Sequence, residues 1–160
     1  MSFQYDVKST HRTTSGAILT SGRIRLKGGI VCPSTTTSAH MVFAANTSTS
    51  GTYSQTTTTI TVTMTNTLAA GDRVWLDFTS GTASDAVYTV VTASSSQFTV
   101  TSGTSTTTSG NVTMYGTILV EVDTTNATTF SFVCPGDGVL SESGLYVGLP
   151  ATVTATAFYG

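Results

Sequence analysis

The residue types that most often bind metals are few in this chain and widely spaced. His11, His40, Cys32 and Cys134 are its histidines and cysteines. A structural zinc site usually takes two of its ligands from positions two to four residues apart. These four residues include no such pair, so the sequence predicts no metal site.

The sequence also lacks the motifs that commonly carry catalytic residues. The sequence contains no G-x-S-x-G stretch, in which a serine nucleophile occupies a strand-to-helix turn. The eight carboxylates include no pair whose spacing marks a glycosidase. Lys27-Gly28-Gly29 precedes an expected strand rather than the helix N-terminus that a phosphate-binding loop needs. We therefore predict that the protein is not an enzyme and has no catalytic residues and no cofactor.

The two cysteines allow two readings. Cys32 and Cys134 each stand in a Val-Cys-Pro triplet, and the first residues of the chain lack the apolar core of a signal peptide. Buried free thiols are then the ordinary state. The alternative is a disulfide that joins the two ends of the chain, and this depends on a distance that the sequence does not give.

Charge is scarce and unevenly distributed. Charged residues make up 9% of the chain, and the net charge is −2, whereas an ordinary globular domain has roughly 25%. Five of the six lysines and arginines lie in residues 1–50, and seven of the eight acidic residues follow them. The acidic total argues against nucleic acid as a partner. No apolar run reaches the roughly 20 residues of a membrane span, so we expect no membrane partner.

Two rows of charge stand on expected strands. Arg23, Arg25 and Lys27 alternate with apolar residues, and so do Glu121 and Asp123. Alternation places each row on one face of its strand. We expect the two rows either to pair across neighbouring strands or to serve as docking charges.

Apolar residues alternate with threonine and serine over most of the chain, which holds 37 Thr and 20 Ser. Threonine is β-branched and fits a pleated strand better than a helix. Strict alternation predicts strands at Thr59–Thr65, Arg73–Phe78 and Val87–Val91, with shorter ones at Phe98–Val100 and Val112–Met114. Five short strands in so few residues predict a small module that resembles a β-barrel.

The flanking residues predict further strands, for example Arg23–Val31 and Thr117–Asp123. Two Ser/Thr/Gly-rich stretches interrupt the pattern: Asn46–Thr58 resembles a linker and Thr101–Gly110 a long hairpin loop. We expect an all-β protein. Residues 1–50 and 114–160 would form a β-sandwich base of the jelly-roll type, and residues 53–113 an inserted five-stranded module.

One aromatic cluster could form a binding platform. Trp75 alternates out of phase with Val74 and Leu76, so it belongs to the other face of its strand. An exposed Trp75 beside Tyr88 or Tyr115 would suit stacking against a sugar or a protein. The alternative is that Trp75 seals the module against a neighbouring segment.

Several segments resemble virion proteins. Residues 56–114 are similar to a β-module common in structural proteins of marine tailed phages, above all cyanophages; the likeness runs through Gly71-Asp72-Arg73-Val74-Trp75-Leu76-Asp77-Phe78 and Ser109-Gly110-Asn111-Val112-Thr113. The flanks resemble a family of smaller virion proteins without the insert, at Ser21–Gly28, Gly116–Asp123, Pro135–Leu140 and Phe158–Gly160.

The resemblance implies a virion structural protein, made in the bacterial host's cytoplasm and located on the phage particle surface. Within that class we expect a capsid decoration or cement protein on the outer head, bound to the major capsid protein and self-associated as a homo-oligomer, for example a trimer. Two alternatives remain open: a tail or neck adhesin that contacts the host surface, and a carbohydrate-binding module.

Overall fold

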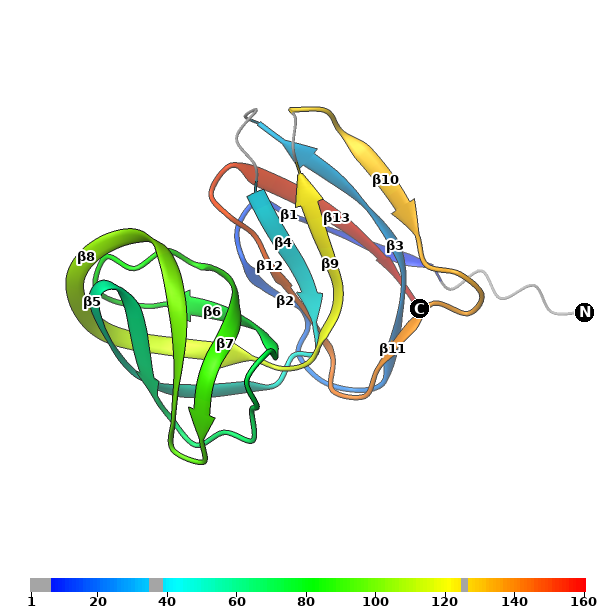
Figure 1. Cartoon of the computed structure of the whole chain (residues 1–160). Helices are drawn as coiled ribbons and strands as arrows, with labels where there is room; N and C mark the ends of the chain where they lie inside the picture. The colour runs from blue at the N-terminus through cyan, green and yellow to red at the C-terminus, as the bar shows by residue number, and fades with distance from the viewer. Residues whose placement is uncertain (1–6, 35–38, 125–126) are drawn as a thin grey trace, which may run out of the picture. The chain divides into compact units, whose positions relative to one another are not determined.

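The computed structural model describes residues 7–34, 39–124 and 127–160, which form thirteen β-strands (Figure 1). The all-β prediction is therefore confirmed. Within the described residues, no helix has the length and apolar character needed to cross a membrane.

The chain divides into two compact units. Unit 1 comprises residues 1–46 and 119–160, and unit 2 comprises residues 47–118. The predicted division placed the junctions a few residues further into the insert. Each unit has a hydrophobic core built from its own residues.

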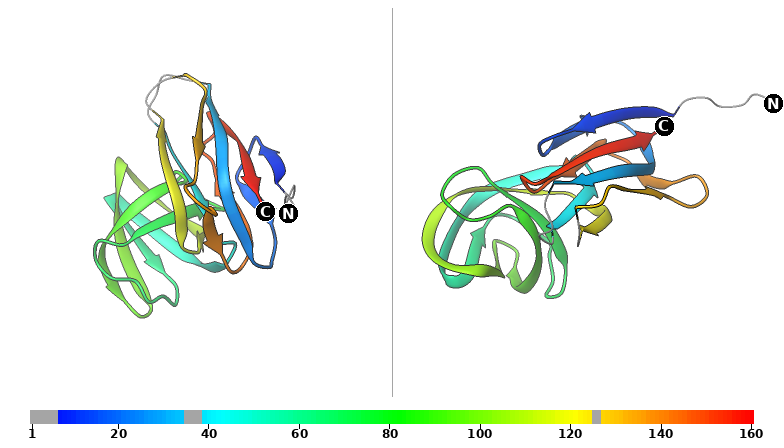
Figure 2. Two further views of the ribbon diagram at one scale, coloured as in Figure 1. Left: turned by 90° about the vertical axis from the view of Figure 1, so that its right-hand side faces the viewer. Right: turned by 90° about the horizontal axis from the view of Figure 1, so that it is seen from above.

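Unit 1 is a sandwich of two antiparallel sheets, whose layers are visible edge-on in Figure 2. The first sheet has the strand order β1-β13-β3-β10, with β11 also paired to β3. Its strands are β1 (Lys8–Arg12), β13 (Val153–Tyr159), β3 (Ile24–Pro33), β10 (Phe130–Val133) and β11 (Val139–Ser141). The second sheet has the order β2-β12-β4-β9. Its strands are β2 (Gly16–Leu19), β12 (Leu145–Gly148), β4 (Ala39–Ala44) and β9 (Ile118–Thr124).

Apolar side chains, which alternate with polar ones along the strands, fill the space between these two sheets. Leu26 and Val31 of β3 are fully buried in the same core cluster as Phe43 of β4 and Leu145 of β12. Because both sheets contribute to one cluster, their inner faces pack against each other as in a β-sandwich. The rings of Phe43 and Phe132 lie with centroids 5.6 Å apart, within the usual range of an aromatic pair.

Unit 2 contains four strands where the alternation predicted five. They are β5 (Ser48–Thr63), β6 (Arg73–Phe78), β7 (Ala86–Ser94) and β8 (Gln97–Tyr115), in the order β5-β8-β6-β7 with a further pairing of β8 to β7. The count differs because the residues around Phe98 and around Val112 belong to the same 19-residue strand, β8.

Two stretches predicted as linker and loop are strand instead. Asn46–Thr58 lies mostly in β5, and Thr101–Gly110 lies inside β8. The two pair with each other in antiparallel register, from Tyr53 opposite Gly110 to Thr57 opposite Thr106. Their Ser/Thr composition suits a solvent-exposed pair of strands, since each β-branched threonine favours extended backbone and its hydroxyl faces water. Composition alone does not separate this case from a flexible linker.

The sheet of unit 2 is strongly curled and does not close into a barrel. The register of β5 against β8 shifts between Thr57 and Thr59, and Thr57 has a positive φ of 56°. A bulge of this kind bends a strand and increases its twist. As a result Gly51, near the start of β5, lies against Thr63 at its end: an added Cβ at Gly51 would stand 2.2 Å from the Thr63 carbonyl oxygen.

The concave side of this curl holds the core of unit 2. Ile60 and Val62 of β5 pack there with Leu76 of β6, Phe98 and Val100 of β8, and all five are almost completely buried. Tyr53 and Phe78 add an edge-to-face ring contact with centroids 4.6 Å apart. The Tyr53 hydroxyl donates to the Ser80 carbonyl oxygen at 3.1 Å, so a buried ring keeps its polar end paired.

Candidate functional site

A row of three cations follows β3 on the outer face of the first sheet of unit 1. Ile24 and Leu26 are 5% and 0% exposed, whereas Arg25 and Lys27 are partly exposed and Arg23, just before the strand, is exposed. The predicted division of the strand into a basic face and an apolar face is confirmed. We call Arg23, Arg25 and Lys27 the basic row.

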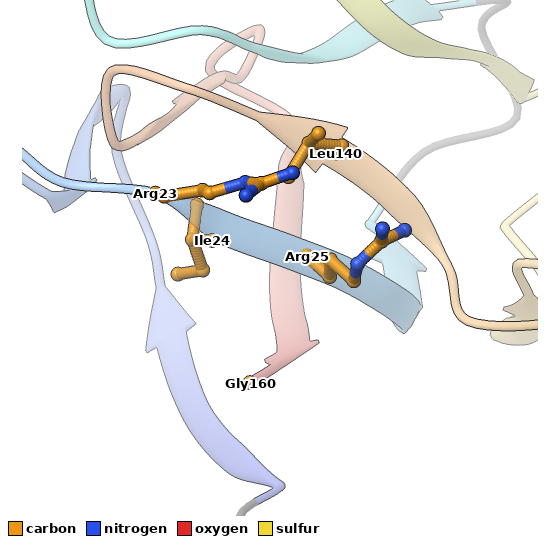
Figure 3. Close-up of a pocket in the computed structure, with 5 residues that line it drawn as sticks. All are labelled: Arg23, Ile24, Arg25, Leu140 and Gly160. Atoms are coloured by element: carbon orange, nitrogen blue, oxygen red, sulfur yellow. The ribbon is translucent and has the colours of Figure 1, made fainter.

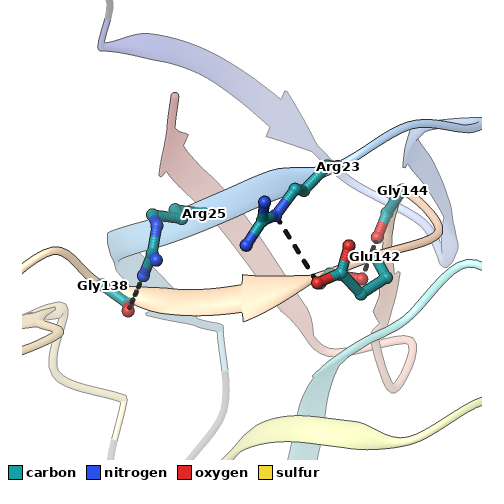
Figure 4. A network of polar contacts seen from close by, with 6 residues as sticks. Arg23, Arg25, Gly138, Glu142 and Gly144 are labelled. Atoms are coloured by element: carbon teal, nitrogen blue, oxygen red, sulfur yellow. Dashed lines mark hydrogen bonds and ion pairs between the residues drawn. The ribbon is translucent and has the colours of Figure 1, made fainter.

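Each member of the basic row has a partner near β11. Arg23 Nε lies 3.5 Å from a carboxylate oxygen of Glu142, and Arg25 Nη1 donates to the Gly138 carbonyl oxygen at 3.3 Å (Figure 4). Lys27 Nζ donates to the carbonyl oxygen of Asp137 at 2.7 Å. Two of the three cations are thus held by backbone oxygens. These hydrogen bonds orient the side chains of Arg25 and Lys27. Because a carbonyl oxygen carries no net charge, the bonds do not neutralise the two positive charges.

Pairing of the basic row with Glu121 and Asp123 is not what the structure shows. The basic row lies on β3 and the residue just before it, in the first sheet of unit 1, and the two acids belong to β9 in the second sheet. Neighbouring strands of one sheet are needed for cross-strand pairs. The sequence pattern gave the face of each row correctly but contained no information on which strands are neighbours.

A depression of about 320 Å³ lies beside the basic row. Its lining residues are Arg23, Ile24, Arg25, Leu140 and Gly160 (Figure 3). Arg25 and Gly160 exchange two backbone hydrogen bonds of 2.9 and 3.1 Å, which fix the floor of the depression. Guanidinium groups present planar donors that match carboxylates. The arrangement is therefore suited to holding acidic side chains of another molecule.

Glu121 and Asp123 instead meet a histidine. His40 of β4 contacts Asp123 through Nδ1, and the same nitrogen lies 3.8 Å from a carboxylate oxygen of Glu121. The two strands are neighbours in the second sheet of unit 1. His40 and Asp123 are exposed and Glu121 is partly buried. The sequence alone does not indicate this cluster, because the partners of His40 lie about eighty positions away along the chain.

Of the two readings of Trp75, the structure agrees with the second, a sealed side chain, and not with an exposed platform. Trp75 is 0% exposed and Tyr88 is 8% exposed, while Tyr115 is only partly exposed. Both faces of β6 are covered at this point, so a position out of phase with the core residues is still buried. The Trp75 indole nitrogen has no hydrogen-bond partner among the described residues.

Burial also changes the pKa of the Tyr88 hydroxyl. Its hydroxyl donates to the Ser84 carbonyl oxygen at 2.7 Å. Burial is the main cause that raises the pKa of Tyr88 to about 12, and the negative charge of Asp85 adds to the shift. A tyrosine in this state serves as a packed, hydrogen-bonded side chain rather than as a stacking surface for a ligand.

The disulfide reading is wrong, and the two cysteines are free thiols. The Cys134 N–H donates to the Lys27 carbonyl oxygen at 2.8 Å, so Cys134 lies beside Lys27 on β3. Cys32 is on β3 itself, five positions further on, or about 16 Å away at the usual rise of a strand. A disulfide needs Cα atoms within about 7 Å. Burial raises the pKa of the Cys134 thiol, which keeps it protonated and unreactive.

No protein-family model matches the chain. No curated protein shows a significant match to it either.

Proposed function

We propose that this protein is a non-enzymatic structural protein of a tailed-phage particle, a decoration or cement protein on the outer surface of the head. The observation that carries the proposal is the architecture. A complete β-sandwich, with its own core, carries a second complete unit inserted through one antiparallel pair of strands. One unit can then dock while the other is displayed. The resemblance of both parts to virion proteins is the second support.

In this proposal the basic row of unit 1 is the docking element, and the major capsid protein is the partner. Adhesion of this kind works by burying area at subunit junctions, about 800 Å² per partner in a stable complex. Cations at an interface increase the association rate and select the register, while apolar contacts supply most of the affinity. Decoration proteins usually bind as symmetric oligomers, so we propose that the chain self-associates, with a trimer as the leading arrangement.

The displayed unit has a surface suited to exposure in water. Along the paired strands β5 and β8, Ser54 faces Ser109 and Thr56 faces Thr107, and all four are exposed. Short hydroxyl side chains bind water and add little net charge. We propose that this uncharged hydroxyl surface lets many copies stand close together on one particle, since neighbouring copies of low charge repel each other weakly.

The copy number of the chain in purified particles tests the location. Quantitative mass spectrometry against the major capsid protein should give a ratio near one to one or one to three. A ratio below about one to thirty would instead assign the chain to the tail or neck, the second candidate, with unit 2 as the segment that contacts the host. Absence from the particle would reject both. The third candidate, a carbohydrate-binding module, loses its main support because Trp75 is buried.

A binding assay tests the docking element. The double variant Arg25→Glu and Lys27→Glu should lower the occupancy of the protein on particles that lack it, and the wild type should bind more weakly as salt increases. Lys8→Glu, at an exposed lysine on the edge strand β1, is the control and should bind as the wild type does. This control changes the net charge half as much as the double variant does. If the control loses about half as much binding free energy as the double variant, total charge rather than the basic row governs docking.

A further inference from the structure

Three side chains of the second sheet of unit 1 offer metal-binding atoms at one place. His40 comes from β4, and Glu121 and Asp123 come from the neighbouring strand β9. One ligand atom from each residue can be chosen so that all three lie within 4.8 Å of one another. Glu121 and Asp123 are two positions apart on their strand, so the pleat directs both toward the same side as the histidine.

The distances are close to those of a coordination sphere. Around a tetrahedral zinc ion with bonds of about 2.1 Å, ligand atoms lie about 3.4 Å apart. His40 Nδ1 is already 3.8 Å from the Glu121 carboxylate, and it is in direct contact with Asp123. Side-chain rotations that move these atoms by about 1 Å would therefore complete the site. The side chains of His40 and Asp123 are 50% and 63% exposed, which leaves them free to rotate.

The residue types select the class of ion. An imidazole with two carboxylates is a mixed nitrogen and oxygen set, which suits Zn²⁺. Magnesium and calcium prefer sets made only of oxygen, so a histidine ligand disfavours them. The charges of the three side chains also favour a divalent cation. Two carboxylates carry two negative charges and a neutral imidazole carries none, so an ion of charge +2 would neutralise the cluster.

We propose that His40, Glu121 and Asp123 bind one Zn²⁺ ion at the surface of unit 1, with water in the remaining position. The ion would join β4 to β9, which is the edge strand of its sheet. Binding to the folded state alone would then raise the temperature at which unit 1 unfolds. This site is independent of the docking element, which lies on the other sheet, and of the proposed location in the virion.

The test is isothermal titration calorimetry of the full chain with Zn²⁺, repeated with Mg²⁺. We expect one Zn²⁺ per chain and no comparable binding of Mg²⁺. His40→Gln and Asp123→Asn should each weaken Zn²⁺ binding by about tenfold or more. Asp137→Asn removes an exposed carboxylate of the same unit outside the cluster and should bind as the wild type does. Circular dichroism would verify that each variant is folded.

A second pair of variants tests whether the cysteine thiols bind the Zn²⁺ ion. Cys32→Ser and Cys134→Ser should leave Zn²⁺ binding unchanged. Binding that disappears in either serine variant and persists in His40→Gln would place the ion elsewhere and overturn the proposal. So would the absence of Zn²⁺ binding in the wild type, which would leave His40 and Asp123 as a simple surface pair.

Discussion

Gly51 offers the sharpest test of the curled sheet in unit 2. The bend of β5 brings Gly51 against the end of its own strand, where an added Cβ would lie 2.2 Å from the Thr63 carbonyl oxygen and 2.7 Å from Met64 Cβ. Carbon atoms in a packed interior stay about 3.5 Å or more apart. A methyl group at this position therefore requires the curl to open by about 1 Å at its tightest point.

The expected cost follows from two opposing effects. Overpacking a closely packed site costs about 1–3 kcal/mol. Replacing glycine by alanine also restricts the unfolded chain, which stabilises by about 0.4–1 kcal/mol. Because the added Cβ meets backbone rather than the end of a flexible side chain, the overpacking cost belongs to the upper part of its range, and the Gly51→Ala variant should lose about 1–2 kcal/mol. With a urea dependence of about 1–1.5 kcal/mol per M for a unit of this size, the unfolding midpoint should fall by about 1 M.

Trp75 makes the measurement specific to unit 2. It is the single tryptophan of the chain, it belongs to β6 of unit 2 and it is 0% exposed in the folded chain, so its fluorescence follows the unfolding of the strand that carries it. Gly103→Ala is the matched control, because nothing lies within 4 Å of an added Cβ there. If Gly51→Ala unfolds at the same urea concentration as Gly103→Ala or at a higher one, the close approach of the two ends of β5 is wrong.

Three further predictions concern single residues. Thr57→Gly should stabilise unit 2 by about 0.5 kcal/mol, because the left-handed conformation costs a β-branched residue about 1–2 kcal/mol and glycine in a strand costs somewhat less. Thr59→Gly should destabilise in the same urea titration, and equal effects would contradict the strain at Thr57. Because the pKa of Tyr88 is raised to about 12 in the folded state, unit 2 should lose stability as the pH rises from about 10 towards 12. Tyr88→Phe should remove that loss, as followed by thermal unfolding against pH. Cys32 and Cys134 should both stay free after mild oxidation of the folded protein, and a mass loss of two hydrogens per monomer would refute their separation.

Local pattern predicted much of the fold. The alternation at Arg73–Phe78 coincides with β6, and the alternation of β3 correctly separated its basic and apolar faces. A strand's inward and outward faces depend on a period of two, which is present in the sequence itself. The existence of these strands and their inward faces could therefore be predicted.

Features that depend on distant contacts could not be predicted. Thr101–Gly110 has the composition of a loop, and only its pairing with β5 makes it a strand. For Trp75 the sequence left two readings open, an exposed platform and a sealed side chain, and only the covering of the second face of its strand decides for the sealed one. The same limit applies to the site, since whether Glu121 lies beside Arg25 or beside His40 is decided by the order of strands in the sheets.

The pairing of Ser48 with Tyr115 has a consequence for the history and the engineering of this chain. Residues that face each other in an antiparallel pair have Cα atoms about 5 Å apart. The two points where the chain leaves and re-enters the sandwich are thus as close as the ends of a tight hairpin. A two-residue Asn-Gly turn could replace residues 49–114, and any foreign domain whose termini meet could be grafted there. Such a junction lets recombination add, exchange or remove the inserted unit in one event while the sandwich keeps its sequence.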